Sequence, residues 1–212
     1  MPSLELVAFD LYGTLLDVSG LAAGMRPIVG DGAPALLARW RQAQLELSWR
    51  VGRGDPYQPW DLLTLRALED VAPELPIASR ERLAQLWLTV PAFGDAGATL
   101  DVLKASGVRR AVLSNGTRGM ITRALEASGL AVDGVLSADD VRAYKTHPHV
   151  YALLDAEAHG SQTLFVSANG WDVDGAQRTG RTVAWIDRGG DPPLATPKHR
   201  ITSLSDVLGL LE

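Results

Sequence analysis

Seven polar residues that could do covalent chemistry stand just after short apolar runs or in the loop before a helix. They are Asp10, Ser114, Asn115, Lys145, Ser167, Asn169 and Asp172. A carboxylate can act as a covalent nucleophile, an ammonium group can compensate its charge, and a second carboxylate can activate a water molecule. If the apolar runs are strands of one parallel sheet, these residues meet beyond the carboxyl ends of the strands, where ligands bind. The pattern therefore predicts a nucleophilic active site.

Each of these residues also has a purely structural interpretation. An Asp at a strand end often forms an Asx-turn, and a Ser-Asn-Gly sequence often forms a simple turn. A lone Lys before a helix is commonly solvated, and Asp172 could cap the helix that follows it. The joint occurrence of all these residues at the same predicted edge favours the functional interpretation.

The elements that would position these residues alternate between strands and helices. Short apolar runs predict strands at 4–9, 110–113, 134–136, 163–166 and 182–186. Helical spacing and Gly or Pro boundaries predict helices at 98–105, 120–127, 148–158, 174–178 and 203–211. This alternation is typical of a parallel sheet with helices on both faces.

The stretch between the first two strands has helical apolar spacing throughout, with helices predicted at 33–50, 60–68 and 80–88. The predicted fold class is therefore α/β, a Rossmann-like parallel sheet core with an inserted helical cap. We expect residues 1–15 and 92–212 to form the catalytic core and residues 16–91 to form the cap domain.

Composition narrows the class of protein. The 212 residues are 46% hydrophobic and 21% charged, which is typical of a globular chain that buries its own core. The formal net charge of −5 argues against nucleic acid or an anionic membrane as the main partner. The absence of cysteine excludes disulfides, thiolate zinc sites and cysteine nucleophiles. With no signal-peptide pattern after Met1 and no long apolar run, we expect a soluble cytoplasmic protein.

Four segments together resemble the motifs of the haloacid dehalogenase superfamily, in order and spacing, along nearly the whole chain. They are residues 10–17 (DLYGTLLD), 113–117 (LSNGT), 144–145 (YK) and 166–172 (VSANGWD). A fifth segment, residues 40–46 (WRQAQLE), is similar to the arginine-containing cap motif of the L-2-haloacid dehalogenase branch. The resemblance implies conversion of short L-2-haloacids to D-2-hydroxy acids, without a cofactor or a metal ion.

Position 12 distinguishes this branch from the phosphatases of the superfamily. Those phosphatases carry a second Asp there, which serves as general acid and base and helps to bind magnesium. This chain has Tyr12 instead. A halide ion is a weak base that leaves without a proton, so a dehalogenase needs no general acid at this place. Tyr12 could also be an aromatic packing residue beneath the cap.

The implied mechanism starts with attack by Asp10 on C2 of the substrate, which forms an ester that water then hydrolyses. Lys145 is expected to compensate the charge of the two carboxylates that meet. Ser114 and the backbone near Asn115 would hold the substrate carboxylate, while Thr14 and Ser167 would orient Asp10. Asp172, with Asn169, would position or activate the hydrolytic water. Tyr151 would support Lys145 or Asp172, and plain core packing is its alternative.

A halide site needs an electropositive cradle for the charge that develops on the leaving group. Arg41 lies between Leu37 and Leu45 on one predicted helix face, so it interrupts an apolar stripe. An Arg that snorkels from that stripe is the structural alternative, and the cap motif favours the halide role. The resemblance completes the halide site with Asn115 and Trp171. It places five residues in the wall of the substrate pocket: Tyr12, Gln42, Leu45, Trp60 and Trp171.

Three other functions stay open at this stage. A magnesium-dependent phosphatase on the same fold is one, because Asp174 adds a second acid to the fourth motif; an acid in the first turn of a helix is the alternative for that residue. A fluoroacetate-active defluorinase within the same branch is another, and a non-enzymatic binding or scaffold protein is the third. The expected partners are a small anionic haloacid and its halide, with no nucleic acid and no membrane, and a second copy of the chain in a homodimer.

Overall fold

The computed structural model describes residues 4–158 and 162–211. These residues form one sheet of six parallel strands in the order β3-β2-β1-β4-β5-β6. The strands are β1 (Leu4–Phe9), β2 (Arg109–Ser114), β3 (Gly134–Ser137), β4 (Gln162–Ser167), β5 (Thr182–Ile186) and β6 (His199–Ile201). The α/β class with a parallel sheet is therefore confirmed.

Helices cover both faces of this sheet and form a separate layer beyond one end of it. The α-helices are α1 (Leu21–Val29), α2 (Ala33–Val51), α3 (Trp60–Val71), α4 (Ile77–Gln85), α5 (Ala96–Ala105), α6 (Arg118–Ser128), α7 (Pro148–Ala158) and α8 (Gly170–Arg178). Five short 3-10 helices connect them, at η1 (Val18–Gly20), η2 (Gly30–Gly32), η3 (Leu86–Leu88), η4 (Ala138–Val141) and η5 (Leu204–Leu210).

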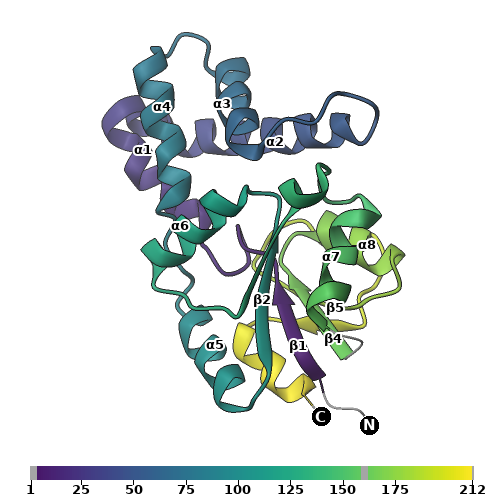
Figure 1. The fold of residues 1–212 in the computed structure, drawn as a ribbon. Helices are drawn as coiled ribbons and strands as arrows, with labels where there is room; N and C mark the ends of the chain where they lie inside the picture. The colour runs from purple at the N-terminus through teal and green to yellow at the C-terminus, as the bar shows by residue number, and fades with distance from the viewer. Residues whose placement is uncertain (1–3, 159–161, 212) are drawn as a thin grey trace.

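Helices α1 to α4 pack on one another and form the layer that we call the helical layer. It lies beyond the carboxyl end of the sheet, opposite the described N-terminal end of β1 (Figure 1). The chain enters this layer after β1 and leaves it before α5, and the two connecting segments run side by side. Asp17 N donates to Pro91 O at 2.7 Å, and Phe93 N donates to Leu15 O at 2.9 Å.

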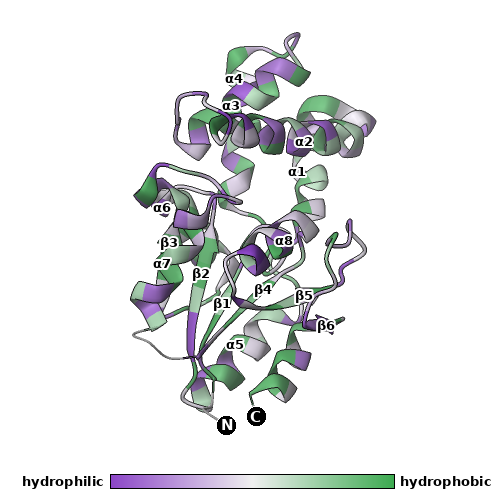
Figure 2. Cartoon of the chain, turned by 90° about the vertical axis from the view of Figure 1, so that its right-hand side faces the viewer, coloured by the Kyte–Doolittle hydropathy of each residue, from purple (hydrophilic) through white to green (hydrophobic). Residues whose placement is uncertain are grey.

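The central strand β1 is buried on both faces, as a parallel sheet between helices requires. Leu6, Val7, Ala8 and Phe9 are each at most 1% exposed, and the strands are largely hydrophobic where they run through the middle of the fold (Figure 2). Phe9 pairs with Val112 of β2 and with Val166 of β4. This register brings the strand ends to one level, so the residues that follow each strand become neighbours.

Local sequence explains why α2 can present a side chain to that edge. Pro34 stands in the first turn, where a missing N–H costs nothing. Leu36, Trp40 and Leu47 are buried at helical spacing, and Trp40 Nε1 donates to Thr64 O of α3 at 2.8 Å. These contacts fix the rotation of α2, which turns Arg41 toward the sheet.

The structure differs from the sequence-based predictions at several elements. The sequence did not predict helix α1 or strand β6. Strand β6 has only three residues, which are too few for a periodic pattern. Residues 204–210 form a 3-10 helix after a capping box at Ser203, where we expected an ordinary helix. Helix α8 begins at Gly170 rather than at Asp174, so Asp172 lies inside its first turn and does not cap it. No helix of the described residues has the length and apolar character that a membrane span needs.

Candidate active site

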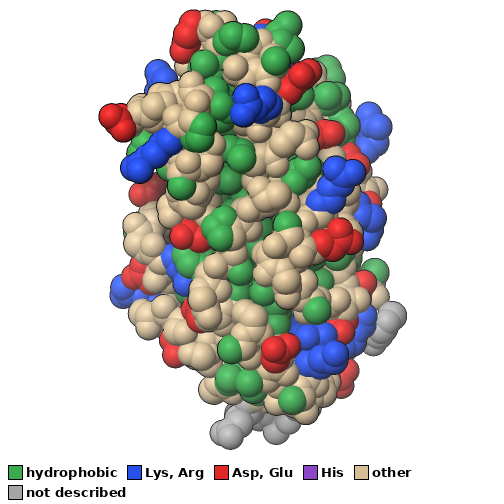
Figure 3. All heavy atoms as spheres, turned by 90° about the vertical axis from the view of Figure 1, so that its left-hand side faces the viewer, with side chains coloured by type: hydrophobic (Ala, Val, Ile, Leu, Met, Phe, Trp, Pro, Cys, Tyr) green, Lys and Arg blue, Asp and Glu red, His purple; other side chains and the backbone are tan. Residues whose placement is uncertain are grey.

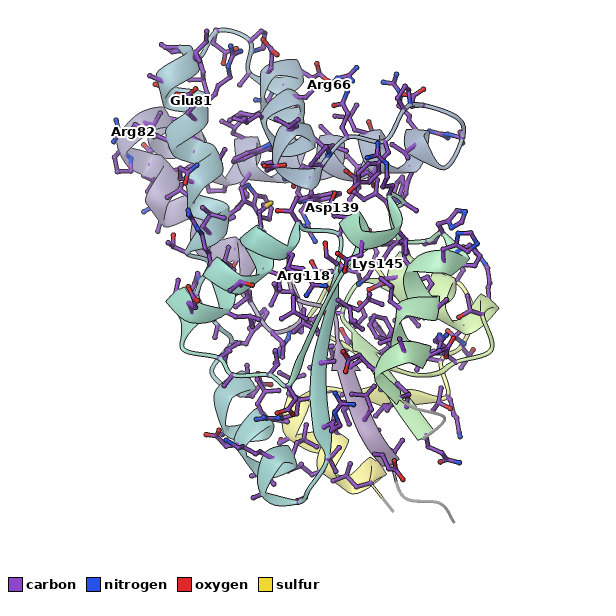
Figure 4. All side chains as sticks on the ribbon, in the orientation of Figure 1. Arg66, Glu81, Arg82, Arg118, Asp139 and Lys145 are labelled. Carbon is purple, nitrogen blue, oxygen red and sulfur yellow. The ribbon has the colours of Figure 1, made fainter. Side chains whose placement is uncertain are left out.

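An ammonium group lies between two carboxylates at the carboxyl edge of the sheet. Lys145 Nζ donates to Asp10 Oδ1 at 2.9 Å and to Asp172 Oδ2 at 2.8 Å. The three side chains are between 0% and 8% exposed. Figure 4 shows Lys145 between the sheet and the helical layer. Because two buried carboxylates would repel each other, the cation is what allows them to stand this close.

Burial and the neighbouring charges shift the pKa values of Lys145 and Asp172 in opposite directions. Burial by itself would lower the pKa of Lys145, but the carboxylates of Asp10 and Asp172 outweigh it and raise that pKa above the ordinary value of 10.5. Burial raises the pKa of Asp172, Asp10 adds to the rise, and Lys145 opposes it. The arrangement holds a charged ammonium and a carboxylate poised to accept a proton.

The second oxygen of Asp10 is held by two neutral donors. Thr14 Oγ1 donates to Asp10 Oδ2 at 3.0 Å, and Asn169 Nδ2 donates to the same oxygen at 2.8 Å. Gly13, at φ +92°, makes the turn that brings Thr14 back beside Asp10; L-residues with a side chain rarely adopt that φ. The expected contact of Thr14 with Asp10 is present, and Asn169 also contacts Asp10 directly.

Asp172 accepts hydrogen bonds from several sides. Ser167 Oγ donates to Asp172 Oδ2 at 2.8 Å, so the prediction that Ser167 orients Asp10 is wrong. Tyr151 Oη donates to Asp172 Oδ1 at 2.8 Å. Gly175 makes this approach possible, since a Cβ there would lie 2.5 Å from Tyr151 Oη. Tyr151 thus supports Asp172, one of the two alternatives that the sequence left open.

A cavity of about 20 Å³ opens beside Asp10, which is room for about one water molecule. Its lining combines a nucleophile, cations and aromatic walls from both the sheet edge and α2. The lining residues are Asp10, Tyr12, Arg41, Leu45, Trp60, Ser114, Asn115, Gly116, Lys145, Asn169 and Trp171. Sequence reasoning named all of these except Gly116, whose signal was its place in the Ser-Asn-Gly segment.

Arg41 brings a cation to this cavity from the helical layer. Its Nη2 donates to Tyr12 O at 3.2 Å, and no described carboxylate forms an ion pair with it. Burial lowers the pKa of Arg41, and the charge of Asp10 opposes that change. Asn115 Oδ1 accepts from Lys145 N at 2.9 Å, which ties the second strand end to the lysine loop. The cavity therefore has positive charge available for a bound anion.

Gln42 does not belong to this site. Its side chain is exposed and donates to Glu46 Oε1 at 2.8 Å. Gln42 is turned by about 100° from Arg41 around the helix axis, and among the residues of this turn Arg41 and Leu45 line the cavity. The prediction that Gln42 walls the pocket is wrong.

Asp174, the second acid of the fourth motif, accepts hydrogen bonds from two backbone N–H groups. Asp174 Oδ2 and Oδ1 accept from Leu194 N at 2.9 Å and Ala195 N at 3.0 Å, which anchors the loop before β6. Among the described residues, no group of three or more His, Asp and Glu side chains has an arrangement that could hold a metal ion.

Comparisons with known proteins agree with this geometry. The family model of haloacid dehalogenase-like hydrolases matches residues 4–180. The (S)-2-haloacid dehalogenase 4A of Burkholderia cepacia is 38% identical, over 99% of this chain and 95% of the relative. The crystal structure of a dehalogenase with an intermediate complex has a TM-score of 0.92 at 37% identity, covering 100% of this chain and 98% of the other.

A third comparison concerns a structure that holds a covalent adduct. The L-2-haloacid dehalogenase from Xanthobacter autotrophicus, with chloropropionic acid covalently bound, has a TM-score of 0.87 at 29% identity. The alignment covers 98% of each chain. The similarity extends over the sheet and the helical layer alike.

Proposed function

The chain belongs to the haloacid dehalogenase-like hydrolases, and from that premise we propose that it hydrolyses short L-2-haloacids to D-2-hydroxy acids through an ester on Asp10. The observation that carries this proposal is the pair of contacts that Lys145 makes with Asp10 and Asp172, beside a cavity lined by Arg41. The full-length relatives named (S)-2-haloacid dehalogenases support the substrate class.

In the first step, a carboxylate oxygen of Asp10 forms a bond to C2 of the substrate while the carbon–halogen bond breaks and halide leaves with the electron pair. Attack from the side opposite the halide inverts C2. Lys145 stabilises the carboxylates that meet, and Thr14 and Asn169 hold Asp10 in one orientation.

In the second step, water attacks the carbonyl carbon of the Asp10 ester. Asp172 is the base that takes the proton, consistent with its raised pKa. The ester oxygen leaves with the substrate and takes up a proton, which gives the 2-hydroxy acid, and Asp10 is regenerated with one oxygen from water. The configuration at C2 does not change in this step.

Arg41, Asn115 and Trp171 form the halide end of the cavity in this proposal. Arg41 meets the charge that develops on the leaving halide, and Trp171 closes that end by contact with Trp49 of α2, with ring centroids 6.1 Å apart. Ser114 and the backbone near Asn115 hold the substrate carboxylate. Tyr12, Leu45 and Trp60 form the remaining wall.

The aromatic side chain of Trp60 in the cavity wall favours two- or three-carbon acids. Room for about one water molecule does not admit a haloacid in this closed arrangement. We propose that residues 16–91 act as a cap that separates from the core on the paired segments around Leu15 and Phe93. Such closure excludes water from the first step.

Halide release from separate L- and D-2-chloropropionate, with and without EDTA, tests the proposed function. We expect release from the L form only, unchanged by EDTA, and a loss of at least about 10³-fold in Asp10→Asn. Asp101→Asn removes an exposed carboxylate of α5 and is the matched control, expected to keep full activity. Full turnover in Asp10→Asn would exclude the ester mechanism, and magnesium-dependent hydrolysis of p-nitrophenyl phosphate without halide release would favour the phosphatase.

The homodimer and the cytoplasmic location belong to the same proposal. Leu62 of α3 and Ile77 of α4 are 53% and 67% exposed. On one face of the molecule, hydrophobic side chains run down the middle and charged ones lie mostly toward the rim (Figure 3). Burial of such a surface against a second copy would remove apolar area from water. Sedimentation equilibrium and cell fractionation test the two predictions.

A further inference from the structure

A tryptophan of the helical layer, outside the cavity lining, contacts two residues that line the cavity. Trp87 stands in η3, between α4 and the segment that returns to the core, and is 0% exposed. Its backbone oxygen accepts from Tyr12 Oη at 3.0 Å. Its ring lies edge-on to the ring of Tyr12, with centroids 5.5 Å apart.

The same ring lies beneath the cation of the site. Arg41 Cζ lies 5.7 Å from the centroid of the Trp87 ring, within the range of a cation–π contact. Trp40 packs edge-on against Trp87 from α2, with centroids 5.6 Å apart, and so fixes the orientation of the ring. No described carboxylate forms an ion pair with Arg41, so the face of Trp87 is a negative surface that this guanidinium contacts within the helical layer.

One polar atom of Trp87 argues that the residue is there for more than packing. Nε1 is buried without a hydrogen-bond partner among the described residues. An unpaired buried donor is destabilising, and a Phe would fill most of the space without it. A Trp ring also attracts a cation more strongly than a Phe ring does.

We propose that Trp87 is a positioning residue, which holds the Arg41 guanidinium against the cavity through its ring face and holds Tyr12 through its backbone carbonyl. This inference rests on the proposed dehalogenation. Trp87 does not touch the substrate; it acts through Arg41, so its effect depends on how much the leaving halide needs the cation. Chloride, the poorer leaving group, needs more stabilisation than bromide.

The test compares kcat for L-2-chloropropionate and L-2-bromopropionate in Trp87→Phe and Trp87→Leu. We expect Trp87→Phe to lower kcat for the chloro substrate by about three- to tenfold, with a smaller loss for the bromo substrate. Trp87→Leu should show a larger loss of kcat for the chloro substrate than Trp87→Phe does. Since Phe removes the unpaired donor, the urea midpoint of Trp87→Phe should stay near that of the wild type.

Trp185→Phe is the control for loss of a cation–π contact away from the cavity. Trp185 is also buried and Arg200 lies over its ring at 5.2 Å, but Arg200 is at the surface, and Trp185 Nε1 donates to Ala168 O. The effect of Trp185→Phe should be equal for the two leaving groups. Equal losses for both halides in Trp87→Phe, or no loss at all, would overturn the positioning role.

A bromide titration measured by calorimetry separates this inference from the proposed function. It measures halide binding at Arg41 without any turnover. Weaker bromide binding in Trp87→Phe than in the wild type supports the positioning role even if the wild type releases no halide, in which case the proposed function alone fails. Unchanged bromide binding in Trp87→Phe contradicts the role.

Discussion

At the scale of single residues, the site is an arrangement of charges that balance one another. Lys145 is shared by Asp10 and Asp172, and Arg41 stands across the cavity without a described carboxylate partner. In the proposed reaction, the positive charge of Arg41 is thus available to the departing halide. Truncation of Lys145 would leave two buried carboxylates without their cation, a strongly unfavourable state.

The raised pKa of Lys145 predicts the alkaline side of the pH profile. The ammonium form is favoured by its two carboxylates, so activity that depends on it is present below the ordinary pKa of 10.5 and is lost only above it. We expect kcat/KM for L-2-chloropropionate to show no Lys145-dependent fall up to pH 10, and Lys145→Met to lose at least about 10³-fold at every pH. A fall of the wild type centred near pH 8 or 9, with unchanged folding by circular dichroism, would contradict this assignment.

At the scale of elements, Arg110 enters the core from strand β2 as one half of an ion pair whose partner, Asp133, is exposed to water. Arg110 is 2% exposed, and its Nη2 and Nε donate to the two carboxylate oxygens of Asp133 at 2.7 and 2.9 Å. Asp133 Oδ2 also accepts from Arg110 N, and Asp133 N donates to Arg110 O. This pair fixes the start of β2 against the segment before β3, and with it the level at which Ser114 ends the strand.

Asp133→Asn should lower the free energy of unfolding by about 1–3 kcal/mol at pH 7, because Arg110 loses its charged partner while water still reaches the Asp133 side. The hydrogen bonds from Arg110 lower the pKa of Asp133. The stabilisation is therefore present above the ordinary value of 3.8 and is lost as the pH falls below it. Urea unfolding at pH 7 and at pH 3 checks both parts.

In the same experiment, Asp101→Asn should change the free energy of unfolding by less than about 0.5 kcal/mol, since this carboxylate is exposed. A cost of Asp133→Asn that is as large at pH 3 as at pH 7 would show that the charge of Asp133 is not what stabilises the strand.

At the scale of the whole molecule, hydrogen bonds and a ring contact join the loop after α2 to the core, and the proposed opening of the cap would have to break them. Tyr57, in the loop after α2, donates from Oη to Asp139 Oδ1 at 2.6 Å. Tyr144 Oη donates to Gln58 O in the same loop, and the rings of Tyr57 and Tyr144 lie 5.1 Å apart. Figure 4 shows Asp139 on the core side, just below the helical layer. Because Tyr144 directly precedes Lys145, the proposed opening would also remove one contact that holds the lysine loop.

Tyr57→Phe should therefore shift the molecule toward the open arrangement. Loss of one partly buried hydrogen bond of about 0.5–1.5 kcal/mol predicts faster amide exchange in residues 52–60, by about two- to tenfold. Hydrogen exchange followed by mass spectrometry measures this, and helix α5, far from the contact, serves as the internal reference. Exchange that accelerates equally in α5 would indicate global destabilisation instead of local opening.

The sequence by itself determined the class of fold and predicted most of the residues that meet at the carboxyl edge of the sheet. Apolar runs of strand length that alternate with helical spacing leave a parallel sheet as the economical arrangement, and polar residues at the ends of those runs must then meet at one edge. Asp10, Lys145 and Asp172 could be predicted because the sequence gives both their chemical type and their position at a strand end or in a loop.

Only the tertiary structure decided which atoms meet. Ser167 ends its strand beside Asp10, because the preceding residues Val166 and Phe9 are paired, and packing turns its hydroxyl toward Asp172 of α8. The rotation of α2 about its axis is fixed by Trp40 and its neighbours. It places Arg41 at the cavity and Gln42 at the surface. Trp87 carries no chemical signal in the sequence, since an aromatic residue at helical spacing is typical of any core. Periodicity specifies that a residue faces the interior, whereas the partner it finds there depends on elements far away along the chain.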